Sequence, residues 1–171
     1  HPGADLARLV DGGVPHNIFE GYEPLAGRTA EAFKREFTIQ GLSGETWWDW
    51  DAQAPRNGFA RNPLESNLIP PDLRLDRLGS NGGGFLSPEG TPLAERATPP
   101  GLATQYHVFE GTGREIPSGK EWVVQHGPAK DAFGQPGGGD QWIVLDKTTG
   151  WPVPVEELIQ ARLLKEITPP K

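Results

Sequence analysis

Apolar residues recur at the spacing of an α-helix in two segments of the chain. The pattern predicts one helix over Thr29–Phe37, where Thr29 is suited to the N-cap, and another over Val155–Leu164, where Pro154 is suited to the first turn. The apolar residues that carry these patterns are Ala30, Phe33 and Phe37 in the first helix and Val155, Leu158, Ile159 and Leu163 in the second. A further short helix is expected at Asp5–Val10.

Between these helices, apolar and polar residues are arranged as in β-strands, and glycines and prolines interrupt them often. The candidate strands are Glu45–Trp50, Leu73–Leu78, Tyr106–Glu110, Glu121–Gln125 and Gln141–Leu145. We therefore expect an α+β fold, with a β-rich core of small twisted sheets or a partly closed barrel, N-terminal helices and a short C-terminal helix. Residues 1–50 are expected to form a helical and irregular N-terminal subdomain, and residues 51–171 the core.

Composition and charge narrow the possible partners. Only 35% of the 171 residues are apolar, but six Trp and seven Phe indicate a small core rich in aromatic side chains. A net charge of −7 argues against binding to nucleic acid or a membrane surface, since both need a basic face. The chain has no cysteine, and its four histidines lack the spacing of metal ligands, so we expect no metal site. Trp47, Trp48 and Trp50 are expected to pack in the N-terminal subdomain, or alternatively to form a ligand-stacking face.

The glycine-rich stretch 75–100 is the first candidate for chemistry. Its glycines allow backbone N–H groups to approach a phosphate, and Arg77 and Arg96 bracket it with two guanidinium groups able to fork onto a diphosphate. The alternative is a glycine-rich hairpin with two surface arginines. The stretch lacks the Gly-Lys-Ser/Thr of a Walker loop, and Pro88 and Pro92 prevent the long helix that a Rossmann fingerprint requires.

The segment 133–142 is the second candidate. Three consecutive glycines make this hairpin loop costly to order, which favours a functional loop over a simple turn. Gln135 and Gln141 supply side-chain amides that donate and accept hydrogen bonds. A flexible hairpin tip is the alternative.

Together these two stretches resemble the family of the tuberculosis necrotizing toxin and the related fungal surface NADases, over about the last hundred residues. The matching pieces are Asp76–Gly79, Phe85–Pro92, Arg96 with Pro99 and Pro100, Tyr106–Val108 and Gln135–Gln141. The resemblance implies an NAD(P) glycohydrolase toxin domain that hydrolyses the nicotinamide–ribose bond and depletes NAD in a target cell. NAD or NADP is then the substrate, and no cofactor is needed.

The resemblance also implies roles for particular residues. Arg77 corresponds to an arginine that engages the substrate phosphates, and Gln141 to a glutamine that closes over the scissile bond; both are expected to be catalytic. Arg96 and Phe85 are expected to bind substrate in the same pocket. Leu78, where the family usually has an aromatic residue, is grouped with them, and the other expected pocket residues are Ser87, Gln135 and His107. For His107, packing on a strand is the alternative.

Two other readings stay open, an ADP-ribosyltransferase and a non-catalytic β-rich ligand-binding module. If the chain is a toxin, its producer needs protection, so a cognate immunity protein is expected. The chain contains no methionine. We therefore expect a C-terminal fragment of a longer effector that is secreted or delivered into a target cell.

Overall fold

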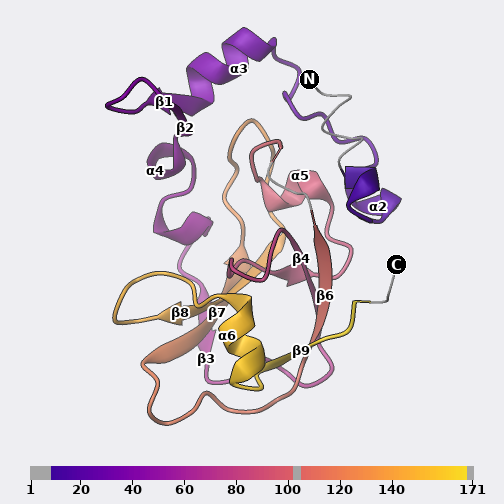
Figure 1. The fold of residues 1–171 in the computed structure, drawn as a ribbon, viewed down its shortest axis with the longest axis vertical. Helices are drawn as coiled ribbons and strands as arrows, with labels where there is room; N and C mark the ends of the chain where they lie inside the picture. The colour runs from indigo at the N-terminus through magenta and orange to yellow at the C-terminus, as the bar shows by residue number, and fades with distance from the viewer. Residues whose placement is uncertain (1–8, 102–104, 169–171) are drawn as a thin grey trace.

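The structure is a computed structural model in which residues 9–101 and 105–168 are described (Figure 1). Its helical segments are α2 (His16–Phe19), α3 (Ala30–Phe37), α4 (Trp50–Gln53), the 3-10 turn η1 (Arg56–Gly58), α5 (Leu93–Arg96) and α6 (Val155–Gln160). Its strands are β1 (Thr38–Gln40), β2 (Thr46–Trp48), β3 (Leu64–Ser66), β4 (Arg74–Leu78), β5 (Ser87–Pro88), β6 (Tyr106–Gly111), β7 (Trp122–Pro128), β8 (Asp140–Asp146) and β9 (Leu164–Glu166). The expected helix at Asp5–Val10 lies mostly outside the described residues.

The strands form small antiparallel sheets, with the orders β1-β2, β3-β7-β8 and β5-β4-β6-β9. This arrangement confirms the α+β fold, and no sheet closes into a barrel within the described parts of the chain. The two larger sheets are joined where Leu86 and Trp142 exchange backbone hydrogen bonds. The main core lies between them and includes Leu75 of β4, Phe109 of β6 and Val144 of β8, all fully buried.

The predicted helix at Thr29–Phe37 is confirmed as α3, and the Thr29 hydroxyl caps it by accepting a hydrogen bond from the Ala32 N–H. The helix predicted over Val155–Leu164 was wrong in its second half, because α6 ends at Gln160. Arg162 takes a left-handed conformation (φ 62°), and the Leu163 N–H donates to the Leu158 carbonyl. This closure resembles a Schellman motif and lets the following residues pair with β6 as β9.

Four predicted strands are confirmed, as β4, β6, β7 and β8. The strand predicted over Glu45–Trp50 is shorter, since β2 covers Thr46–Trp48 and Trp50 begins α4. The cause is Asp49, whose carboxylate accepts a hydrogen bond from the Ala52 N–H and caps that helix.

The N-terminal elements α3, β1 and β2 lie at one end of the long axis, away from α6 and β9 (Figure 1). Phe33 and Phe37 of α3 pack against Phe133, which belongs to the loop between β7 and β8. A separate cluster joins α2 to Leu93 of α5. The division at residue 50 stays a prediction. None of the described helices is long and apolar enough to cross a membrane.

Candidate active site

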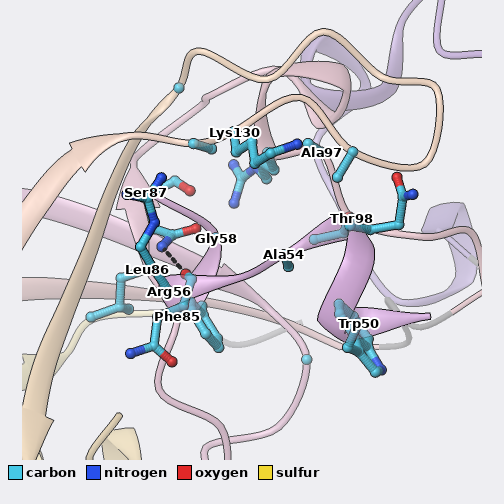
Figure 2. A pocket seen from close by; sticks show the side chains of 18 of the residues that line it. Trp50, Ala54, Arg56, Gly58, Phe85, Leu86, Ser87, Ala97, Thr98 and Lys130 are labelled. Carbon is cyan, nitrogen blue, oxygen red and sulfur yellow. Dashed lines mark hydrogen bonds between the residues drawn. The ribbon is translucent and has the colours of Figure 1, made fainter. Parts of the chain in front are cut away.

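A cavity of about 1200 Å³ is bordered by segments from both halves of the chain. Its lining comes from α4 and η1, the end of β4 and the loop that follows, the end of α5, the loop between β7 and β8, and the turn at 149–151. Figure 2 shows Trp50, Arg56, Phe85 and Lys130 around this space. This volume is slightly above the range of about 300–1,000 Å³ that is usual for small-molecule sites.

Six of the eight residues predicted for the site line this cavity. They are Arg77, Leu78, Phe85, Ser87, Arg96 and Gln141. Phe85 leaves 40% of its surface exposed, so part of its ring is available to contact a ligand. The cavity therefore gathers guanidinium, amide and aromatic groups from separate elements.

Arg77, at the end of β4, is enclosed by the loop that follows it. Its Nε donates to the Ser80 carbonyl at 2.6 Å, and its Nη1 donates to the Phe85 carbonyl at 3.1 Å. A Cβ atom at Gly83 would overlap the guanidinium, so a side chain there would displace Arg77 from its present position. Burial lowers the pKa of Arg77 from its ordinary value, yet an arginine stays charged at neutral pH. No carboxylate pairs with Arg77 in the described residues, so its positive charge is not neutralised.

Arg96 lies in different surroundings, because it is paired with a buried carboxylate. Its Nη1 contacts Asp76 Oδ1, its Nη2 donates to Asp76 Oδ2 at 3.0 Å, and its Nε donates to the Thr91 carbonyl at 2.9 Å. The side chains of Asp76 and Arg96 are 0% and 6% exposed. The Tyr106 hydroxyl and the Gly90 N–H also donate to Asp76. Arg96 thus reaches the cavity with its charge already compensated.

Burial and Asp76 together affect the pKa of Tyr106. Burial raises the pKa of its hydroxyl, and the negative charge of Asp76 and the hydrogen bond to it raise the pKa further. Tyr106 therefore stays a neutral donor to the carboxylate at physiological pH.

Gln141, at the start of β8, is anchored to the turn η1. Its Nε2 donates to the Asn57 carbonyl at 2.7 Å. Asn57 belongs to η1 and has a left-handed backbone conformation, with φ 58° and ψ 23°. This contact fixes the position of the amide in the cavity through a residue 84 positions away in the sequence.

Gln135 and His107 are not among the residues that line the cavity. Gln135 is buried, and its Nε2 donates to the Glu23 carbonyl at 2.8 Å, which ties the loop to the N-terminal segment. His107 Nδ1 lies 2.8 Å from Glu166 Oε2, and its Nε2 lies 3.0 Å from Gln105 Oε1. His107 thus lies one contact away from the cavity, since it pairs with Gln105 through its side chain and with Arg77 across the sheet, and both of these line the cavity.

Glu166 connects this cluster to the glycine-rich loop. Its second oxygen accepts a hydrogen bond from Asn81 Nδ2 at 3.0 Å. Burial tends to raise the pKa of Glu166, but hydrogen bonds from His107, Asn81 and Thr168 outweigh it, and the pKa is lowered. A charged Glu166 thus fastens the loop that encloses Arg77 to the edge strand β9.

Sequence reasoning missed part of the lining. The missed residues include Asp51, Arg56, Asn57, Gln105, Lys130 and Trp151, while Trp50 was named only in the alternative of a ligand-stacking face. The Asn57-Gly58 dipeptide is a turn signal that could have drawn attention to η1. Nothing in the local pattern places that turn beside Gln141. Within the described residues, His, Asp and Glu side chains do not gather in a group of three able to hold a metal ion.

Comparison with known proteins places the chain in a family. Residues 68–167 match the family model described as tuberculosis necrotizing toxin. The chain is 38% identical over 109 residues to a conidial surface nicotinamide adenine dinucleotide glycohydrolase of Aspergillus fumigatus. That match covers 56% of this chain and 44% of the fungal protein, so the chain spans less than half the length of this relative.

A solved structure gives the same fold. The structure of tuberculosis necrotizing toxin complexed with its immunity factor resembles this one with a TM-score of 0.61 and 22% identity. The likeness covers 95% of this chain and 82% of the toxin chain, and at this identity it concerns the fold alone. The family model, in contrast, matches more than half of the chain and includes all the predicted site residues. The chain belongs to the tuberculosis necrotizing toxin family.

Proposed function

We propose that this chain is an NAD(P) glycohydrolase toxin domain, which hydrolyses the bond between nicotinamide and ribose. The main support is that the uncompensated guanidinium of Arg77, the exposed ring of Phe85 and the anchored amide of Gln141 line one cavity. A cation suits the diphosphate, an aromatic ring suits a nucleotide base, and an amide suits ribose hydroxyls or a water. The name of the fungal relative agrees with this assignment.

The chemistry needs little from the protein beyond binding and orientation. An ordinary glycosidase pairs two carboxyl groups, because an alkoxide leaves poorly without a proton. The nicotinamide of NAD is already a cationic pyridinium, so the C–N electron pair leaves with it and neutral nicotinamide departs. One water then forms the new C–O bond at the ribose, loses a proton and gives ADP-ribose. NAD(P) is consumed as substrate, and the reaction requires no cofactor.

The residues of the cavity fit this reaction. The reaction needs no pair of carboxyl groups, and the described lining residues include only one carboxylate, the exposed Asp51. Arg77 and Phe85 would hold the dinucleotide away from the reacting bond, and this binding energy would bring the ribose against Gln141. Gln141 would orient the ribose or the attacking water.

The test is release of nicotinamide by the purified chain, with Gln141→Ala as the variant. We expect turnover by the wild type without any acceptor protein. In the variant, we expect kcat to fall at least about tenfold, and by more than KM changes, since the amide acts on the reacting bond. Gln160→Ala, at the exposed end of α6, is the matched control and should leave the rates unchanged. Turnover that requires an acceptor protein would indicate a transferase, and binding of NAD without turnover would indicate a binding module.

As a toxin domain, this chain would be exported or delivered into a target cell, and its producer would carry an immunity protein. The solved toxin of this family is complexed with such a factor. Because this chain carries a net charge of −7, we expect a basic contact surface on its own inhibitor. To test this, the chain is expressed in the cytosol of the producer after deletion of each neighbouring gene that could encode the immunity protein. Unimpaired growth in every deletion strain would contradict the proposal.

A further inference from the structure

Four cationic side chains of the described residues line the cavity, and they differ in how their charge is held. These are Arg56, Arg77, Arg96 and Lys130. Arg96 is paired with a buried carboxylate, and the Lys130 ammonium lies 3.9 Å from the aspartate that follows it. Arg77 donates to two carbonyls. Arg56 has neither an ion pair nor a side-chain hydrogen bond within residues 9–101 and 105–168, and it is exposed.

The turn that carries Arg56 has a costly backbone conformation. Arg56, Asn57 and Gly58 are consecutive residues with φ of 54°, 58° and 80°. Only the glycine adopts the left-handed region without steric cost, so the two side-chain-bearing residues are held there against their preference. Such conformations persist where the surrounding structure fixes them, and they are concentrated at functional sites.

The surrounding structure does fix this turn, through three separate contacts. The Asn57 carbonyl accepts from Gln141 Nε2 at 2.7 Å, and the Gly58 carbonyl accepts from the Lys130 N–H at 2.7 Å. Asn57 Nδ2 donates to the Gly150 carbonyl at 3.4 Å. All of these partners line the cavity. Hydrogen bonds therefore hold the backbone of the turn in the cavity wall, while the guanidinium of Arg56 has no partner among the described residues.

We propose that Arg56 is a further substrate-binding residue, whose guanidinium donates to the diphosphate of the dinucleotide. The proposal rests on the proposed function, since it names a contact to that same substrate. Arg77 presents positive charge from the end of β4 and Arg56 from η1, so the two reach the same cavity from different segments of the chain. A planar guanidinium matches the geometry of phosphate oxygens. Arg56 thus takes the second phosphate-binding place that the sequence pattern gives to Arg96.

The experiment measures the binding of ADP and of adenosine by calorimetry, beside the steady-state hydrolysis of NAD. For Arg56→Gln we expect the Kd of ADP to rise about tenfold, which corresponds to the loss of one charge-assisted hydrogen bond, while the Kd of adenosine stays the same. KM for NAD should rise by a similar factor, with kcat within about twofold of wild type. Arg61→Gln is the matched control, because Arg61 is a nearby exposed arginine that does not line the cavity.

Arg56→Gly separates binding from folding. Glycine relieves the left-handed strain at this position, so the thermal unfolding midpoint should equal or exceed that of the wild type while ADP binding weakens as in Arg56→Gln. If both variants bind ADP as the wild type does, or if the wild type does not bind ADP, the assignment of Arg56 is overturned. If the wild type binds ADP in an Arg56-dependent way but releases no nicotinamide, the glycohydrolase function fails and the phosphate contact stands.

Discussion

Two regions beside the cavity each hold one arginine, but with different partners. One is the buried network of Asp76, Arg96 and Tyr106, and the other is the glycine-rich loop that follows β4. Arg96 lies in the network, where the Asp76 carboxylate takes both of its Nη groups and solvent reaches 6% of its side chain. Arg77 lies under the loop, where its partners are two backbone carbonyls. The sequence pattern treats the two residues alike, as brackets of one stretch.

The difference separates a structural arginine from one available to a ligand. A guanidinium that faces a carboxylate in a buried site is neutralised by it. Each partner is then needed chiefly because its removal would leave the other as an uncompensated buried charge, which destabilises the fold. A guanidinium that is held by neutral carbonyls keeps its full positive charge and can attract an anion. We therefore expect changes at Asp76 or Arg96 to act on folding, and changes at Arg77 to act on the reaction.

The largest effect is expected from Asp76→Asn, which removes the negative charge and leaves Arg96 as a buried, unpaired cation. Removal of one partner of a buried ion pair costs about 3 kcal/mol or more, so the free energy of unfolding should fall by about this amount. Urea denaturation measures it. The double variant with Arg96→Gln should lose less than the sum of the two single changes, because no unpaired charge is left. A single variant that unfolds at the wild-type urea concentration would show that the network does not hold the fold.

Arg77→Ala should have a smaller effect, and mainly on catalysis. A hydrogen bond to a charged group contributes about 1.5–3 kcal/mol, so kcat/KM for NAD should fall at least about tenfold. The free energy of unfolding should fall less than in Asp76→Asn, because Arg77→Ala leaves no buried charge without its partner. Initial rates of nicotinamide release and urea denaturation together measure the two effects.

Arg77→Lys is the informative companion of this variant. It keeps the charge but loses the planar fork that reaches both carbonyls, so its kcat/KM should lie between those of Arg77→Ala and the wild type. The distinction between the two arginines would be wrong if Arg77→Ala had wild-type kinetics and lost as much stability as Asp76→Asn. Arg77 would then be a structural arginine like Arg96.

Elements specified by local chemistry were predictable from the sequence. The helix α3 follows from apolar spacing and the capping residue Thr29, and β4, β6, β7 and β8 follow from their apolar patterns. The helix α6 was predicted too long because Leu163 and Leu164 continue its apolar spacing. Its end depends on Arg162 in a left-handed conformation, for which the sequence carries no glycine as a signal.

Contacts between distant segments were not predictable in the same way. The burial of Asp76 depends on β4 lying between β5 and β6 in one sheet, which the alternation within a single strand does not reveal. Gln135 and Gln141 lie only six positions apart, in the loop before β8 and at the start of β8, and both offer an amide. Gln135 instead meets Glu23, 112 positions earlier, while Gln141 reaches η1 in the cavity wall. Each partner is fixed by tertiary structure.

The smallest effect is expected at Glu166, whose carboxylate accepts a hydrogen bond from Asn81 of the glycine-rich loop. Its contribution to the free energy of unfolding should depend on pH. The pKa of Glu166 is lower in the folded protein than in the unfolded chain. The charged carboxylate therefore stabilises the fold above the unfolded pKa, and this contribution is lost as the pH falls through the folded pKa. Glu166→Gln should lower the free energy of unfolding by less than about 1 kcal/mol at neutral pH, because the side chain is partly exposed and solvent screens its interactions.

The difference in stability between the wild type and Glu166→Gln should then shrink from about pH 4.3 downward, where the unfolded glutamate begins to bind a proton. Urea midpoints measured across this range test it, with Glu115→Gln as a control for removal of an exposed acid outside the cluster. A difference that stays constant with pH would mean that the charge of Glu166 does not hold Asn81, and that the loop over Arg77 depends on its glycines and backbone contacts instead. In that case the loop, like the buried network, would be maintained by contacts independent of this surface charge.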